Sequence, residues 1–144
     1  MGRLSVDDII VTPLKRLAVS GGDVLHALKN SDQGYVNFGE AYFSFIEHGA
    51  VKAWKRHLRM TLNLVVPVGA ARFVFIDNKN NIREELIGED RYFRLTVPPG
   101  IWFGFKGLAL PASLLLNVAD IPHDPTEVER KSRDAFMINW ETSE

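Results

Sequence analysis

The sequence predicts an all-β fold, because turn-forming clusters recur along most of the chain and short strand-like runs lie between them. The runs are rich in Val, Ile, Phe, Tyr and Thr and cover residues 8–13, 23–29, 35–47, 50–57, 61–68, 71–77, 82–87, 91–97 and 113–119. Many short strands at regular spacing are typical of a sandwich, a barrel or a jelly roll. Only the tail, residues 125–131, has a helical pattern, and we expect about two turns of helix there.

The breaks between these runs contain the residues that turns require. They lie at Gly21-Gly22 and at residues 31–34, 77–81, 88–90 and 98–100. Residues 71–77 alternate as a strand should, with Phe73 and Phe75 on one face and Val74 and Ile76 on the other.

Composition indicates one ordinary globular domain spanning residues 1–144, with 46% apolar and 24% charged residues. The formal net charge of −1 argues against nonspecific nucleic-acid binding, so any attraction for anions must be local. The absence of cysteine excludes disulfides and thiolate metal sites. The N-terminus lacks the apolar core of a signal peptide, and no apolar run approaches the roughly 18 residues of a membrane span. We therefore expect a cytoplasmic protein without a membrane partner.

Residues 49–57 form an unusually basic strand-like segment. Alternation places Val51, Ala53, Lys55 and His57 on one face, and Lys52, Trp54 and Arg56 on the other. Burying Lys55 and His57 without partners would be costly, so their face must meet water, acidic partners or a ligand. A charged edge strand is the simpler alternative. The very apolar run that follows, residues 62–68, favours the wall of a pocket for an anionic ligand.

A second unusual segment covers residues 98–105. Pro99 and Gly100 suit the second and third positions of a type II turn. Phe105 is expected in the core. Trp102, beside the turn, is either a core residue or a stacking surface for a nucleobase.

No metal or other cofactor is expected. The histidines are His26, His48, His57 and His123, and none has the spacing of a metal site. Neither a phosphate-binding loop nor a dinucleotide-binding fingerprint is present.

Several segments in order along the chain resemble the cupin-fold dTDP-4-dehydrorhamnose 3,5-epimerase family. They are residues 12–16, 22–25, 38–44, 51–57, 98–105 and 117–125. The resemblance implies a jelly-roll (double-stranded β-helix) barrel with a short C-terminal helical extension. It also implies a homodimer that shares strands across its interface, and a metal-free pocket for a nucleotide-linked deoxysugar.

The family's reaction removes a proton beside a 4-keto group and returns one on the opposite face, which requires a base, a cation near the oxyanion and an acid. By resemblance, the base histidine falls at Lys55, the tyrosine acid near Asn117 and the diphosphate-gripping residue at Lys52. Phe103 stands where the family has another histidine. No cation stands near residues 62–63, the place of the oxyanion lysine.

Two assignments of the proton-handling residues follow. As the base, Lys55 would need its pKa lowered from about 10.4 to about 7–8, a shift that neighbouring positive charges favour. The assignment that requires no such shift makes Lys55 the electrostatic partner and His57 the base. The candidate catalytic residues are therefore His57 and Lys55, and the candidate ligand-binding residues are Lys52, Arg59, Asn63, Trp102 and Asn117.

The predicted function is a nucleotide-sugar 3,5-epimerase or isomerase that acts on a 4-keto-6-deoxyhexose in surface-polysaccharide biosynthesis. The alternative is a non-catalytic cupin module that binds a nucleotide sugar or a partner enzyme.

Overall fold

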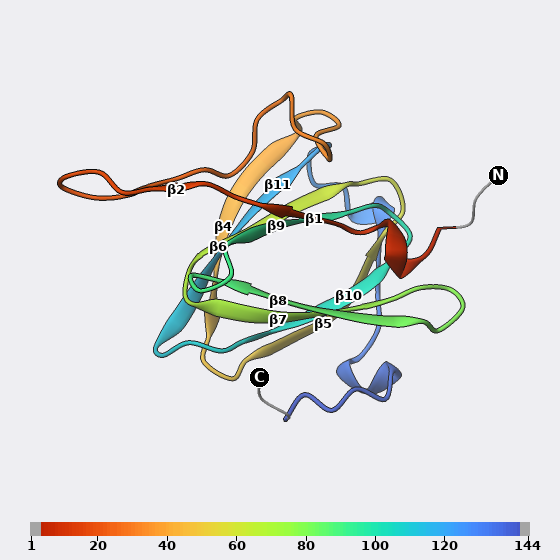
Figure 1. Ribbon diagram of the computed structural model, residues 1–144. Coiled ribbons are helices and arrows are strands. Elements are labelled where there is room, and N and C mark those ends of the chain that lie inside the picture. Colours follow the sequence, from red (N-terminus) through yellow and green to blue (C-terminus); the bar gives the residue numbers. More distant parts are fainter. Residues whose placement is uncertain (1–3, 142–144) are drawn as a thin grey trace.

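Two antiparallel sheets face each other in the computed structural model, which describes residues 4–141 (Figure 1). The first sheet has the order β1 (Ile10–Pro13), β9 (Phe93–Val97), β6 (Leu62–Val68), β11 (Ala112–Ala119) and β4 (Glu40–Glu47). The second has the order β12 (Val128–Arg130), β5 (Val51–His57), β10 (Trp102–Gly107), β7 (Ala70–Ile76) and β8 (Ile82–Gly88). Neighbouring strands are mostly distant in sequence, as in a jelly roll.

The remaining elements lie outside these sheets. Strands β2 (Arg16–Leu17) and β3 (Val24–Leu25) form a hairpin that projects from the body of the molecule (Figure 1). The 3₁₀ turns are η1 (Val6–Asp8), η2 (Pro125–Glu127) and η3 (Arg133–Ala135). Among residues 4–141, no helix has the length and apolar character needed to cross a membrane.

The main core fills the space between the sheets, and alternation along the strands builds it. Phe73 and Phe75 of β7 point into this core, while Val74 and Ile76 point out of the second sheet, as the sequence predicts. Burial of apolar side chains on both faces of β7 explains why this run is almost continuously hydrophobic.

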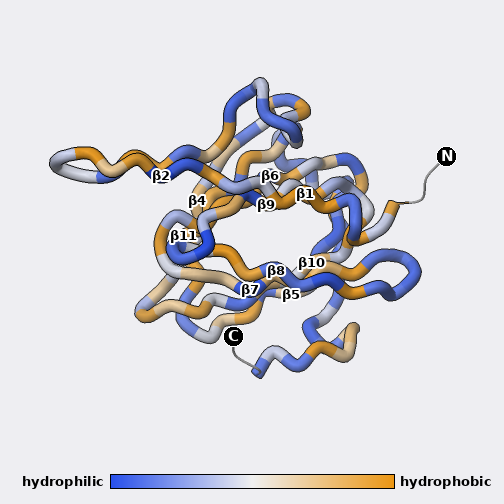
Figure 2. Tube along the Cα trace, viewed as in Figure 1, coloured by the Kyte–Doolittle hydropathy of each residue, from blue (hydrophilic) through white to orange (hydrophobic). Residues whose placement is uncertain are grey.

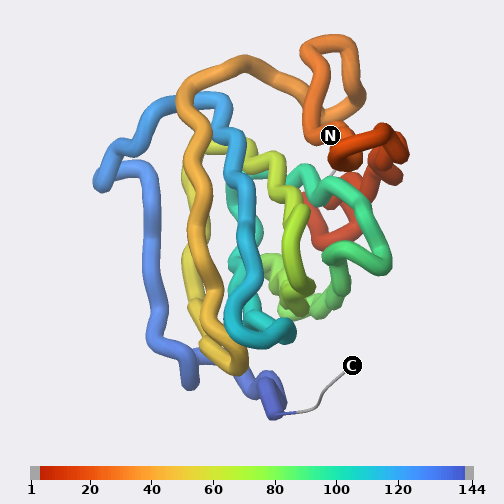
Figure 3. Tube along the Cα trace, turned by 90° about the vertical axis from the view of Figure 1, so that its left-hand side faces the viewer, coloured from red at the N-terminus to blue at the C-terminus, as the bar shows by residue number. Residues whose placement is uncertain are grey.

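A second, smaller cluster covers the outer face of the second sheet. It joins Trp54 and Trp102 to Phe136 and Trp140 from the C-terminal segment, residues 128–141. Figure 3 shows this segment running beside β5, with which β12 pairs from Val128 opposite His57 to Arg130 opposite Lys55. The aromatic cluster therefore fastens the end of the chain to the strand that carries the basic residues.

The all-β prediction is confirmed, but several boundaries differ. The run at 23–29 contributes only β3, and the run at 35–47 becomes a strand only from Glu40. In the tail, only Pro125–Glu127 is helical. The next residues form β12 because the edge of β5 offers them backbone hydrogen bonds. The expected turn is present, since Gly100 has a φ of 92°.

Candidate functional site

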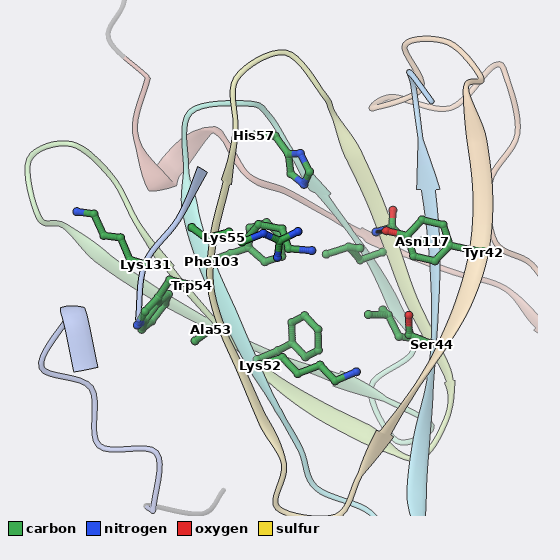
Figure 4. A pocket seen from close by; sticks show the side chains of 14 residues that line it. Tyr42, Ser44, Lys52, Ala53, Trp54, Lys55, His57, Phe103, Asn117 and Lys131 are labelled. Carbon is green, nitrogen blue, oxygen red and sulfur yellow. Dashed lines mark hydrogen bonds between the residues drawn. The ribbon is translucent and has the colours of Figure 1, made fainter. Parts of the chain in front are cut away.

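A cavity of about 410 Å³ opens between the two sheets (Figure 4). One wall consists of Lys52, Lys55 and His57 from β5, Phe103 and Phe105 from β10, and Arg130 and Lys131 at the end of β12. The facing wall consists of Tyr42 and Ser44 from β4, Leu115 and Asn117 from β11, and Leu64 from β6. Ala53 and Trp54 of β5 also border the cavity.

An irregularity in β5 brings Lys52 to the same wall as Lys55. Phe103 pairs with Lys55 and Phe105 pairs with Lys52, so an extra residue of β5 lies opposite the step between Phe103 and Gly104. Such a bulge shifts the side-chain alternation by one residue. The sequence-based prediction that Lys52 and Lys55 occupy opposite faces is therefore wrong, and both line the cavity.

The same bulge turns Trp54 away from the cavity, as Figure 4 shows. Its indole N–H donates to the backbone oxygen of Arg133, and its ring packs edge-on against Phe136 at 5.1 Å between centroids. Trp102 belongs to this outer cluster too, beneath the ammonium of Lys131 at 4.8 Å from its ring centroid. Trp102 is thus a core residue of the outer face, and its assignment to the ligand pocket is not supported.

His57 and Glu127 form a buried pair at the top of the cavity. His57 Nδ1 lies 2.5 Å from Glu127 Oε1, and only 2% of the Glu127 side chain is exposed. The other oxygen, Oε2, accepts the backbone N–H groups of Arg59 and Met60, each at 3.1 Å. An ionised carboxylate accepts only, so Nδ1 carries the imidazole proton. Nε2 is left as the acceptor on the ring that projects into the cavity (Figure 4).

The pKa directions support this protonation state. Burial raises the pKa of Glu127, but the hydrogen bonds from His57, Arg59 and Met60 outweigh burial and lower it overall. For His57, burial is the largest single influence and lowers the pKa, Glu127 raises it, and the charges of Lys55 and Arg130 lower it, so that the pKa is lowered overall. His57 is therefore neutral at neutral pH, which is the state a general base requires.

Lys55 lies on the same wall as His57 without a negative partner. Within residues 4–141 its ammonium group forms neither a hydrogen bond nor an ion pair. Burial lowers its pKa, and the positive charges of Arg130 and Lys52 lower it further. Lys52 instead donates to the backbone oxygen of Phe45 at 3.3 Å.

Tyr42 and Asn117 face this basic wall from the opposite sheet (Figure 4). They are direct neighbours in the register of β4 and β11, and Asn117 Nδ2 donates to the Tyr42 hydroxyl oxygen at 3.1 Å. Burial and the charge of Glu40 raise the pKa of Tyr42, although the bond from Asn117 opposes them. Tyr42 consequently keeps its proton at neutral pH and has it available to donate.

Two predicted ligand-binding residues do not line the cavity. Arg59 points outward and pairs with Asp124 at 3.1 Å on the surface. Asn63 is buried on the far side of β6, where it accepts bonds from Arg94 and Thr96 and donates to the backbone oxygen of Gly34. In the run 62–68, alternation directs Leu64 toward the cavity and Asn63 away from it.

We expect Asn63→Ala to destabilise the fold without affecting the cavity. The change removes an acceptor from Arg94, whose side chain is fully buried, and an unsatisfied buried donor costs about 1–3 kcal/mol. Urea unfolding should show this loss, while the exposed Asn30→Ala control keeps wild-type stability. Unchanged stability together with weakened ligand binding would contradict this assignment.

Sequence reasoning missed three residues that the fold brings to the site. Glu127 lies 70 residues from His57 in sequence, within a segment expected to be only a helical tail. Tyr42 and Arg130 were likewise not singled out. The helix-capping residue Asp124 predicts a turn at this place, but the sequence pattern does not indicate that the turn contacts His57.

The described residues contain no evident metal-binding site. Among residues 4–141, no group of three or more His, Asp or Glu side chains converges as a metal site would require. The polar side chains that line the cavity are Tyr42, Ser44, Lys52, Lys55, His57, Asn117, Arg130 and Lys131.

Comparison with known proteins identifies close relatives of the whole chain, although no family model matches it. A dTDP sugar isomerase from Desulfovibrio desulfuricans G20 shares 34% identity and a TM-score of 0.91, over 99% of this chain and 98% of that one. The probable low-salt glycan biosynthesis epimerase Agl13 of Haloferax volcanii is 26% identical over 78% of each chain. The dTDP-4-dehydrorhamnose 3,5-epimerase of Elizabethkingia anophelis NUHP1 has the same fold, with 12% identity and a TM-score of 0.79 over 99% of this chain and 86% of that one. The predicted jelly roll and the predicted resemblance are both confirmed, and the chain belongs to the family of dTDP-sugar isomerases and epimerases.

Proposed function

We propose that this enzyme epimerises or isomerises a 4-keto-6-deoxyhexose linked to a nucleoside diphosphate, in the biosynthesis of a surface polysaccharide. The observation that carries the proposal is the placement of a base and an acid on opposite walls of one cavity. His57, whose ring Glu127 contacts, lies on one wall, and the pair Tyr42–Asn117 lies on the other (Figure 4).

In the first step His57 Nε2 removes the proton on a carbon next to the keto group. Glu127 acts as a positioning residue, because its ionised carboxylate fixes the tautomer and stabilises the imidazolium that forms. The electrons of the broken C–H bond move toward the keto group, and Lys55 lies on the same wall to act on that group.

In the second step Tyr42 gives its proton to the carbanionic carbon from the opposite face. Asn117 donates a hydrogen bond to the tyrosine oxygen, and this bond stabilises the negative charge that proton transfer leaves there. Removal of the proton from one face of the sugar and return of a proton to the other face inverts the configuration of that carbon. If a proton is instead added to the former keto carbon, its oxygen becomes a hydroxyl group and the hydroxyl group on the neighbouring carbon loses its proton to become the new ketone, so the outcome is an isomerisation.

The positive groups at the cavity suit an anionic substrate, whose diphosphate remains attached to the sugar throughout the reaction. Lys52 and Arg130 line the cavity in a chain whose formal net charge is −1, so the positive charge is concentrated locally. Guanidinium and ammonium groups are the usual partners of phosphate oxygens in proteins. Among the structural neighbours, the sugar 3,4-ketoisomerase QdtA was solved in complex with TDP.

A homodimer and a cytoplasmic location are the remaining parts of the proposal. The hairpin of β2 and β3 forms a small sheet apart from the two large ones and carries hydrophobic residues (Figure 2). Phe43 and Phe45 on the edge strand β4 are 63% and 72% exposed. Exposed aromatic patches of this kind mark interaction surfaces. Light scattering in solution tests the dimer.

The acid limb of the pH–rate profile should lie below the ordinary histidine pKa of 6.5, because His57 acts as a base and its folded pKa is lowered. Protonation at low pH removes the base, so kcat/KM falls only as the pH drops through this lowered value. The position of the acid limb is measured as kcat/KM against pH, with controls for the effect of the buffer itself. A limb well above 6.5 would contradict the protonation state assigned to His57.

The direct test is incubation with dTDP-4-keto-6-deoxyglucose in deuterated water. Proton abstraction by His57 predicts deuterium at C3 or C5 of the sugar, detected by NMR and mass spectrometry. Calorimetry with the same ligand measures binding separately. Tight binding without any exchange would contradict the enzymatic function and support the alternative, a non-catalytic module that binds a nucleotide sugar.

A further inference from the structure

Lys55 occupies the cavity in an environment that suits a nucleophilic amine better than a fixed cation. Its wall includes the apolar rings of Phe103 and Phe105, and Leu64 and Leu115 lie across the cavity. Its charged neighbours, Arg130 and Lys52, are both positive. A lysine that is desolvated and placed beside other cations is the arrangement that activates amines for attack on carbonyl groups.

Among residues 4–141, no carboxylate forms an ion pair with Lys55. Both oxygens of Glu127, which contacts His57, are already engaged by His57 and by the N–H groups of Arg59 and Met60. Burying an ammonium group without a counter-ion costs free energy that the neutral amine avoids. Burial and two positive neighbours thus favour the neutral amine of Lys55, beside a general base on one face of β5.

We propose that Lys55 forms a covalent iminium with the 4-keto carbon of the sugar, so that the reaction proceeds through an enamine. This proposal rests on the proposed function and concerns the same cavity. It differs from the electrostatic role expected for Lys55, because the amine replaces the keto oxygen during the reaction.

Each step of this route balances. The neutral Nζ of Lys55 adds to the carbonyl carbon, and the alcohol formed there takes a proton and leaves as water while the nitrogen lone pair forms the C=N⁺ bond. His57 then removes the adjacent C–H proton, and the electrons form a carbon–carbon double bond and neutralise the nitrogen. Tyr42 protonates that carbon from the opposite wall. Water finally hydrolyses the iminium, which restores the ketone and the free amine, and solvent returns the protons of His57 and Tyr42 to their starting positions.

The positions of these three groups fit that order. Lys55 and His57 lie on one face of β5, one on each side of Arg56, whose side chain points out and pairs with Glu129. Tyr42 faces them across the cavity (Figure 4). A positively charged iminium accepts electrons more readily than a neutral ketone, so the base has a lower barrier to overcome.

The experiment uses the whole chain with dTDP-4-keto-6-deoxyglucose and sodium cyanoborohydride, which reduces iminium ions. We expect a stable sugar adduct, located by mass spectrometry on the peptide that contains Lys55. Lys55→Arg keeps a positive charge but cannot form the iminium, so we expect it to lose both turnover and adduct. Lys79→Arg, on an exposed loop, is the matched control and should form the adduct normally.

A second measurement does not depend on any variant folding correctly. Substrate labelled with ¹⁸O in the keto group should lose the label to water with each turnover, faster than in a control without enzyme. Deuterium exchange without an adduct, retention of ¹⁸O, or an active Lys55→Arg variant would overturn the iminium and leave the proposed function standing. Absence of both deuterium exchange and adduct would overturn the proposed function as well.

Discussion

Glu127→Gln should lower kcat by about 10²- to 10⁴-fold while changing KM little, because the variant disturbs the base without touching the substrate. A glutamine amide is able to donate to Nδ1 of His57, which moves the imidazole proton to Nε2 and removes the acceptor that faces the cavity. Its carbonyl oxygen still accepts the backbone N–H groups of Arg59 and Met60, so the turn should remain folded. Steady-state kinetics with the keto sugar measures the split between kcat and KM.

The pH profile separates this positioning role from a merely structural one. Glu127 raises the pKa of His57, so its removal should move the acid limb of the residual activity to lower pH. Glu129→Gln is the matched control, since Glu129 is exposed and pairs with Arg56 outside the cavity. An unchanged kcat and an unmoved limb in Glu127→Gln would remove Glu127 from the mechanism.

Tyr42→Phe should abolish net inversion but preserve proton removal. The variant keeps the aromatic ring on β4 and loses the hydroxyl that Asn117 contacts, so no acid remains on that wall. Loss of a general acid typically costs about 10²- to 10⁴-fold in rate. Deuterium should still enter the substrate by way of His57, with the original configuration retained at the exchanging carbon.

Comparison of two rates checks this prediction, namely solvent exchange into recovered substrate and formation of inverted product. Tyr35→Phe, a tyrosine outside the cavity lining, is the control and should retain both rates. If Tyr42→Phe inverts the sugar as fast as the native chain, the acid comes from elsewhere and the assignment of the facing wall is wrong.

The sequence located the basic strand and its cavity correctly because local alternation and the apolar run that follows it are strong signals. It placed His57, Lys55, Lys52 and Asn117 among the candidates, and all of these line the cavity. It placed Lys52 on the wrong face, because a bulge depends on how β5 pairs with β10 and not on the residues of β5 alone.

The error at Trp102 has a related cause. A tryptophan beside a turn has the same local sequence pattern whether it faces a ligand or the C-terminal segment. Here Phe136 of the C-terminal segment packs against Trp102 and makes it part of the outer cluster. Likewise the tail residue Glu127 reaches His57 only through the pairing of β12 with β5. Long-range contacts of this kind leave no periodic trace in the sequence.

The most direct test of the account is a structure of the enzyme with its nucleotide-linked keto sugar, or an unreactive analogue, bound in the cavity. We predict that Nε2 of His57 lies about 3–3.5 Å from C3 or C5, with the Tyr42 hydroxyl on the other face of the same ring. A sugar ring that sits away from His57, or that presents one face to both His57 and Tyr42, would contradict the proposed proton transfer.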